Sequence, residues 1–95
     1  MSEEGESFEL YWPGVQKCIV WEYRNRLQLV RLTVKHDWQG QGVGSAVLRE
    51  LQRRGKRITL CAVSDDGRQT DLERFYLRHG FKPHRWDAEL FIWEP

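Results

Sequence analysis

The segment Gln39-Gly40-Gln41-Gly42-Val43-Gly44 has the composition of a turn that holds a phosphate. Glycine lets a chain turn tightly and brings bare backbone close to a ligand. A helix that begins after such a turn presents unpaired N–H groups and the positive end of its dipole, which both attract a phosphate. The spacing fits neither the dinucleotide fingerprint nor a P-loop. A pyrophosphate-bearing cofactor therefore fits, and a Gly-rich connection without a ligand is the alternative.

Tyr76 is the second residue whose type suits a reaction, because a phenol at hydrogen-bond distance can protonate a leaving group. It lies at helical spacing from Leu72 and His79, so the other interpretation is a core aromatic whose hydroxyl reaches the surface. The histidines and the aspartates near them have no standard metal-ligand spacing. We therefore expect no metal site.

Hydrophobic spacing predicts the elements that hold these residues. After a short aromatic run over 8–12, strands are predicted over Val15–Tyr23 and Leu27–Val34, and the three segments form an antiparallel meander. A polar loop over 35–41 follows. A helix then begins near Val43, and Gly55 ends it. One stripe of this helix is apolar, with Val43, Ala46, Val47 and Leu51, and the opposite face carries Arg49, Gln52 and Arg53.

The second half of the chain contains a strand over 57–63, a helix and a closing hairpin over 81–85 and 88–93. Thr70-Asp71-Leu72-Glu73 is a capping-box pattern that predicts the start of the second helix, which Gly80 ends. The order is β-β-β-α-β-α-β-β. The predicted fold class is α+β (mixed α/β), with two helices that cover a central sheet.

The length of 95 residues fits one small domain, which we place at 8–95 after a flexible, acidic N-terminal tail over 1–7. The formal net charge of +1 gives no reason to expect a nucleic acid or an anionic membrane as a partner. No apolar stretch reaches the ~20 residues that span a bilayer. Cys18 and Cys61 lie in apolar runs and are expected to be reduced core thiols, so the cytoplasm is the expected compartment.

Two motifs in this chain resemble those of a known family. Gln39-x-x-Gly42-x-Gly44 resembles the pyrophosphate-binding Gln/Arg-x-x-Gly-x-Gly/Ala motif of the GCN5-related N-acetyltransferase (GNAT) superfamily. Phe75-Tyr76-Leu77-Arg78-His79-Gly80-Phe81 resembles that family's Phe-Tyr-x-x-x-Gly-Phe. Leu32-Thr33-Val34 resembles its splayed strand. The motifs occur in the family's order, with one strand between two helices, and the resemblance to a minimal short form covers about 27–81.

The resemblance implies an acetyl-CoA-dependent N-acetyltransferase, in which an amine attacks the thioester directly in a ternary complex. The pantetheine arm would lie along the splayed strand, and the N–H of Val34 would serve as an oxyanion donor. Tyr76 would protonate the departing thiolate, and Arg78 would meet the 3′-phosphate. The cofactor-binding residues would be Leu32, Thr33, Val34, Gln39, Gly40, Gln41, Gly42, Val43, Gly44, Ser45 and Arg78.

Two features depart from the family pattern. The family's one or two helices between its first strands, which wall the acceptor site, have no counterpart between Trp12 and Val34. Gln28, which cannot take a proton, replaces the glutamate base that protein-directed members often carry. The alternative bases, each of which also fits an ordinary exposed polar residue, are Glu22, His36 and Asp65.

An open acceptor site predicts an acceptor amine on a protein, above all a lysine, because a protein brings its own surface to cover the thioester. A homodimer, in which a neighbouring subunit supplies the missing wall, is a second way to close the site. Two other functions stay open. One is a catalytically weak module that binds CoA or another protein. The other is a phage-type, anti-CRISPR-like acetyltransferase that modifies one protein target.

Overall fold

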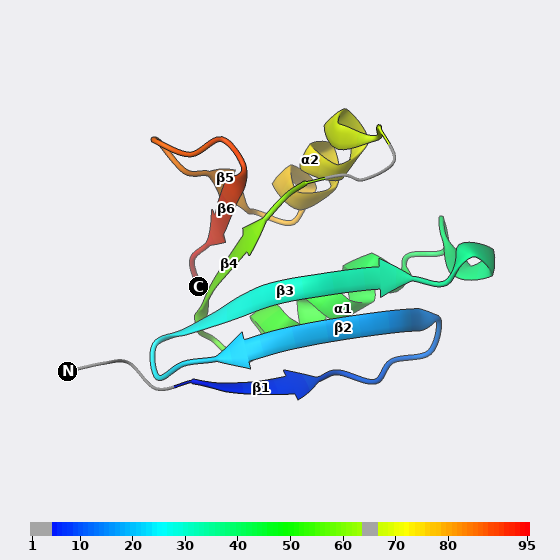
Figure 1. Ribbon diagram of the computed structural model, residues 1–95, viewed down its shortest axis with the longest axis horizontal. Helices are drawn as coiled ribbons and strands as arrows, with labels where there is room; N and C mark the ends of the chain where they lie inside the picture. Colours follow the sequence, from blue (N-terminus) through cyan, green and yellow to red (C-terminus); the bar gives the residue numbers. More distant parts are fainter. Residues whose placement is uncertain (1–4, 64–66) are drawn as a thin grey trace.

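The computed structural model describes residues 5–63 and 67–95, in which one six-stranded sheet has the order β1-β2-β3-β4-β6-β5 (Figure 1). The predicted α+β class and order of elements are confirmed. The strands are β1 (Glu6–Glu9), β2 (Val15–Glu22), β3 (Arg26–Val34), β4 (Arg57–Cys61), β5 (Lys82–Pro83) and β6 (Leu90–Trp93). The helices are the 3-10 helix η1 (His36–Trp38), within the predicted polar loop, and the α-helices α1 (Val43–Gln52) and α2 (Gln69–Arg78).

The first three strands form the antiparallel meander that hydrophobic spacing predicts. β1 begins earlier than the aromatic run, because Glu6 pairs with Glu22 and Ser7 pairs with Trp21. These two residues were expected in the N-terminal tail, but they belong to the sheet. Strand pairing uses backbone N–H and C=O groups, so the polar side chains of Glu6 and Ser7 do not prevent these residues from pairing with β2.

Helix α1 begins where the glycine pattern predicts. Gly42 precedes it with a φ of 79°, in the left-handed region that favours glycine. Gln52, predicted on the outer face, is instead half-buried, and its Nε2 donates a hydrogen bond of 2.8 Å to the carbonyl of His79. This bond ties the C-terminal ends of the two helices together. The buried residues of α1 are Val43, Val47, Leu48 and Leu51.

Helix α2 begins two residues earlier than the capping-box pattern predicts, because its N-cap is Arg68 and not Thr70. Thr70 lies inside the helix, and the helix start has no side-chain cap. The side chain of Gln69 anchors the start of the helix instead. The Nε2 of Gln69 donates to the carbonyl of Ala62 at 2.6 Å and to Oε2 of Glu73 at 2.8 Å. The side chain thus joins the helix to the end of β4, and the expected capping box is wrong.

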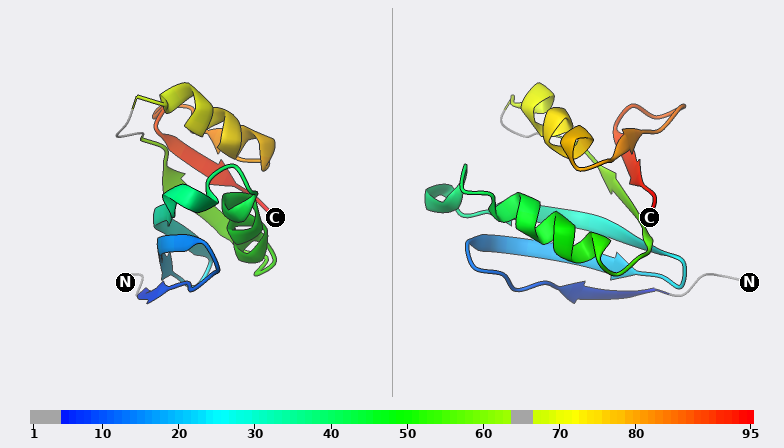
Figure 2. Two further views of the ribbon diagram at one scale, coloured as in Figure 1. Left: turned by 90° about the vertical axis from the view of Figure 1, so that its right-hand side faces the viewer. Right: turned by 180° about the vertical axis from the view of Figure 1, so that it is seen from behind.

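Both helices pack on one face of the sheet (Figure 2). Sheet residues such as Cys18, Leu29 and Leu60 share one buried cluster with Leu48 of α1 and Tyr76 of α2. The opposite face, which is turned toward the viewer in Figure 1, carries no helix of the described chain. Residues 12–34 contain only β2, β3 and turns, so the predicted lack of helices in this stretch is confirmed.

The sheet opens between β3 and β4. The two strands pair in parallel only where Arg26–Leu29 meets Arg57–Leu60. β3 then continues to Val34, whereas β4 ends at Cys61, and the two strands diverge (Figure 1). The end of β3 therefore has backbone groups that β4 does not pair, beside the N-terminus of α1.

Candidate active site

A cavity of about 600 Å³ lies where the end of β3, the Gly-rich turn, α1 and α2 meet. Every residue predicted to bind the cofactor lines it except Gln41, and Tyr76 lines it too. Trp38 also lines the cavity, and its place beside the Gly-rich turn suits either an anchor of the loop or an edge of the cofactor cleft. The other lining residues, which were not predicted, are Arg68, Asp71, Leu72 and Phe75. These four lie at or just before the first turns of α2, so the packing of this helix against α1 brings them to the cavity.

In the Gly-rich turn, Gly40 and Gly42 have a positive φ, whereas Gly44 does not. Gly40 and Gly42 both have a φ of 79°, and a Cβ on either residue would meet no heavy atom within 4 Å. The structure therefore needs these glycines for the path of the chain and leaves open space beside them. The first turn of α1 follows at once, so its unpaired N–H groups face this space.

The two glutamines of the turn serve different purposes. The Nε2 of Gln39 donates to the carbonyl of Val34 at 3.3 Å, which joins the turn to the end of β3. The Nε2 of Gln41 donates to the carbonyl of Asp37 at 3.0 Å. Gln41 does not line the cavity, because its side chain bends back onto the loop that precedes it.

The N–H of Val34 is directed away from β2. The carbonyl of Val34 accepts from Gln39, whereas the next N–H along the strand, that of Lys35, donates to the carbonyl of Gly14 at 2.8 Å. The N–H and C=O groups of one strand residue point to the same side, and successive residues alternate. The N–H of Val34 therefore points toward the side of Gln39, where the cavity lies and β4 no longer pairs.

Tyr76 stands at the inner end of the cavity. Its side chain is only 7% exposed and packs edge-on against Phe75 and Phe81, with ring centroids 5.2 and 5.6 Å away. Its hydroxyl makes no hydrogen bond to the described residues. Burial, with a smaller effect of the Cys18 thiol, raises the pKa of Tyr76 to about 12. The phenol therefore keeps its proton at neutral pH and can donate it to a ligand.

A second cavity, of about 430 Å³, occupies the gap between β3 and β4. It shares Leu32, Thr33, Leu72 and Tyr76 with the first cavity, so the side chain of Tyr76 borders both cavities. Its other lining residues are Leu29, Val30, Arg31, Leu60, Cys61 and Val63. Cys61 was expected in the core but is exposed, because the face of β4 that it occupies has no helix over it.

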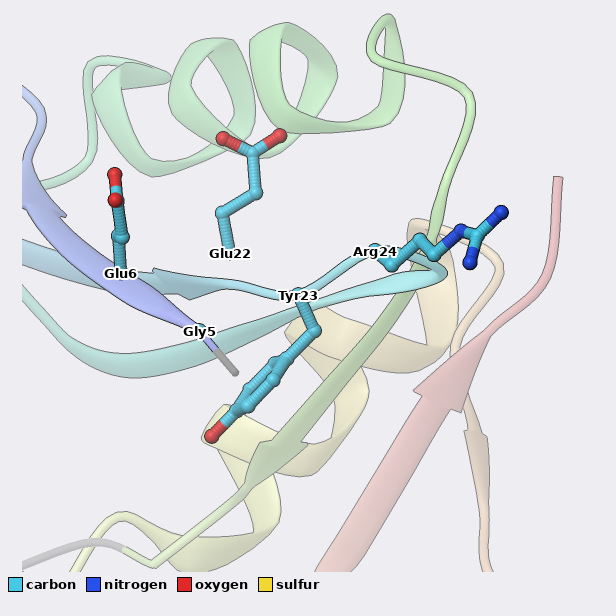
Figure 3. Close-up of a pocket in the computed structure, with 5 residues that line it drawn as sticks. All are labelled: Gly5, Glu6, Glu22, Tyr23 and Arg24. Atoms are coloured by element: carbon cyan, nitrogen blue, oxygen red, sulfur yellow. The ribbon is translucent and has the colours of Figure 1, made fainter. Parts of the chain in front are cut away.

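Glu22 and His36, the candidate general bases within the described residues, line neither cavity. Glu22 lies at the far end of β2, with Glu6 on the same side and Tyr23 turned away (Figure 3). Its Oε2 accepts from Nζ of Lys56 at 2.9 Å, and this bond lowers the pKa of Glu22. His36 is exposed in η1, Gln28 lines neither cavity, and Asp65 lies outside the described residues.

Two further features of the described residues bear on the chemistry. No group of three or more His, Cys, Asp or Glu side chains in residues 5–63 and 67–95 is arranged to hold a metal ion. In the same residues, no helix has the length and apolar character needed to cross a membrane.

The acetyltransferase (GNAT) domain model matches residues 11–83, which is most of the chain. The chain belongs to the GNAT acetyltransferase family. The matched residues include both motifs and the diverging strands β3 and β4, and GNAT domains use acetyl-CoA. No curated protein matches the sequence significantly.

Solved structures share this GNAT fold. The anti-CRISPR protein AcrVA5 has a TM-score of 0.67 at 21% identity, with 93% of this chain and 98% of that chain covered. A GNAT-family acetyltransferase from Bacteroides thetaiotaomicron has a TM-score of 0.67 at 14% identity, over 94% of this chain and 61% of that one. KacTA in complex with DNA has a TM-score of 0.59 at 20% identity, over 96% and 55%. This chain thus spans little more than half of the length of each of the last two proteins.

Proposed function

We propose that this domain transfers the acetyl group of acetyl-CoA to an amine on another protein, above all a lysine. The observation that carries the proposal is that Tyr76 lines both cavities. One cavity leads to the Gly-rich turn, and the other opens between β3 and β4. A donor and an acceptor that entered from the two sides would meet beside a protonated phenol.

The first cavity suits the acetyl-CoA donor. The open space beside Gly40 and Gly42, next to the N-terminus of α1, would hold the pyrophosphate. The unpaired backbone at the end of β3 would bind the pantetheine arm as an added strand. Arg78, and Arg68 at the start of α2, would place positive charge near the 3′-phosphate.

The reaction would need two contributions from the protein. As the amine attacks the thioester carbonyl, the N–H of Val34 would donate to the developing oxyanion, an effect typically worth ~3–4 kcal/mol for one donor. The new C–N bond forms, the C–S bond breaks, and Tyr76 would give its proton to the departing thiolate. Solvent would take the proton that the amine loses and restore the phenol.

The second cavity suits the acceptor. It opens on the sheet face that has no helix, where Val30 and Val63 are exposed at its rim. A small amine would find few enclosing walls here, whereas a protein surface could cover the opening. No carboxylate among the described lining residues can act as a base, so the amine would arrive neutral or lose its proton to water. The free thiols of Cys18 and Cys61 fit a reducing compartment such as the cytoplasm.

The proposal is tested by incubating the protein with acetyl-CoA and a cytosolic extract, and by mapping acetylated lysines with mass spectrometry. Release of CoA thiol is followed in parallel. We expect thiol release and lysine acetylation with the wild-type protein, and much less of both with Tyr76→Phe. Fast acetylation of one small amine, with no lysine modified, would contradict the protein acceptor.

A non-catalytic module that binds CoA is the second candidate, and the lack of a described carboxylate at the second cavity favours it. This candidate predicts binding of acetyl-CoA without thiol release in any extract. An anti-defence acetyltransferase is a special case of the first candidate. Its support is the near-complete coverage of AcrVA5, and its acceptor would be a single protein of a defence system.

A further inference from the structure

Trp38 is a wall of the donor cavity that the two sequence motifs do not include. It lies in η1, directly before the Gly-rich turn, and its side chain is 41% exposed. It lines the cavity together with Val34 and Gln39, which flank the space where β3 ends. An indole in this position has a large apolar surface to offer to the carbon chain of a ligand.

Gly14, in the turn between β1 and β2, is the seat of this indole. A Cβ on Gly14 would lie 2.7 Å from Cδ2 and Cε3 of Trp38 and 2.9 Å from its Cγ. The ring therefore rests on the bare Cα of Gly14, which has a φ of 84°. Gly14 itself is not among the residues that line the cavity.

Backbone bonds fasten the same two segments together. The N–H of Lys35 donates to the carbonyl of Gly14 at 2.8 Å, and the N–H of Trp38 donates to the carbonyl of Lys35 at 2.8 Å. Gly14 thus contacts both Lys35, which follows β3, and Trp38, which ends η1. A loop that is fixed before its ligand arrives loses less conformational entropy on binding.

We propose that Trp38 contacts the acyl donor, beside its pyrophosphate, and that Gly14 is the positioning residue that seats the indole. The inference rests on the proposed function, because it takes acetyl-CoA as the ligand of this cavity. It adds a binding residue outside the Gly-rich turn and a positioning residue from the turn between β1 and β2.

The test compares Gly14→Ala with Gly55→Ala. Gly55 has a φ of 73°, so alanine is strained at both positions, but a Cβ on Gly55 would meet no heavy atom within 4 Å. Binding of acetyl-CoA is measured by calorimetry, and folding is measured by thermal melting. We expect the lower melting temperature in Gly14→Ala, because its methyl group must also displace the indole, and we expect both variants to fold. We expect the Kd to rise by roughly tenfold, a usual scale for one lost aromatic contact, only in Gly14→Ala.

A double-mutant cycle distinguishes the loss of the Gly14–Trp38 contact from a general disturbance of the fold. Trp38→Ala should weaken binding by a similar factor, and Trp38→Phe should restore part of the affinity. Adding Gly14→Ala to Trp38→Ala should then change the Kd no further. Equal Kd values for Gly14→Ala and Gly55→Ala, or additive losses in the double variant, would overturn the seating role. If Gly14→Ala does not fold, an unchanged Kd in Trp38→Ala overturns the proposal. Wild-type protein that fails to bind acetyl-CoA overturns the proposed function as well.

Discussion

Gly44 and Phe75 touch across the two helices. A Cβ on Gly44 would lie 2.9 Å from Cζ of Phe75, at the edge of the donor cavity. Unlike Gly40 and Gly42, Gly44 does not have a left-handed backbone. The third glycine of the motif is therefore needed because it has no side chain. Gly44 already lies inside α1 and has an ordinary helical backbone.

This contact predicts an unusual response to Gly44→Ala. Alanine at a helical position normally stabilises by about 0.8–1.0 kcal/mol relative to glycine. Here the new methyl group would push Phe75 aside, and overpacking of this kind costs about 1–3 kcal/mol. We expect the variant to be less stable and to bind acetyl-CoA more weakly. Thermal melting and calorimetry measure both effects.

Phe75→Leu provides the matched background, because leucine has no atom at the place of Cζ. In that background Gly44→Ala should be neutral or stabilising. A stabilising effect of Gly44→Ala in the wild-type background would show that the contact does not constrain the helices.

Tyr76→Phe should keep the fold and the affinity for acetyl-CoA but lower the turnover by roughly 10²–10⁴-fold, the usual contribution of a positioned acid. The raised pKa of Tyr76, about 12, adds a pH signature. The rate should rise with pH as the acceptor amine loses its proton, and the phenol should impose no fall until the pH approaches 12. Steady-state rates from pH 7 to 10 check this. A turnover in Tyr76→Phe equal to wild type removes the phenol from the mechanism.

Cys18 should make the fold sensitive to alkaline pH. Burial, with a smaller effect of Glu9, raises the pKa of this thiol from 9.0 to about 11 in the folded protein. Because the folded pKa is higher, the stabilisation is complete below pH 9 and is lost as the pH rises toward 11. Urea unfolding of the wild type should show this decline in the free energy of unfolding. Cys18→Ala should flatten the decline, and identical slopes would contradict the assignment.

The acceptor cavity predicts a difference between two exposed apolar residues. Val63, 53% exposed, is at its rim, whereas Leu77, 49% exposed, is on α2 and lines neither cavity. Val63→Arg should lower acetylation of protein lysines at least about tenfold, because it places a like charge on the path of the amine. Leu77→Arg should leave it unchanged, and both should bind acetyl-CoA normally. Equal activities of the two variants in the lysine assay would place the acceptor elsewhere.

Local signals in the sequence predicted most of the fold and part of the cavity lining. The glycines before α1 have a backbone that few other residues adopt, so the position of the turn could be predicted from sequence. The start of α2 could not, because Gln69 anchors it through Ala62, a contact made only after folding. For the same reason Arg68 and Asp71 were not assigned to the cavity that they line.

Cys61 shows a different reason for error. Its apolar neighbours led to the expectation of a core thiol, but burial depends on what covers each face of the strand. Leu60 points into the core and is 3% exposed, whereas Cys61 points to the side without helices and is exposed. The lack of helices between the first strands was predicted. The resulting exposure of Cys61 on β4 could not be, because it depends on which sheet face those helices would have covered.

The central claim is that the Gly-rich turn holds the pyrophosphate of acetyl-CoA, and a calorimetric titration tests it most directly. The titration compares wild type, Gly42→Val and Gly55→Val, since both glycines have a left-handed backbone but only Gly42 lines the cavity. The account predicts one acetyl-CoA bound per chain in the wild type and in Gly55→Val, and no measurable binding in Gly42→Val. Absence of binding in the wild type, or equal affinity in a folded Gly42→Val variant, would contradict it.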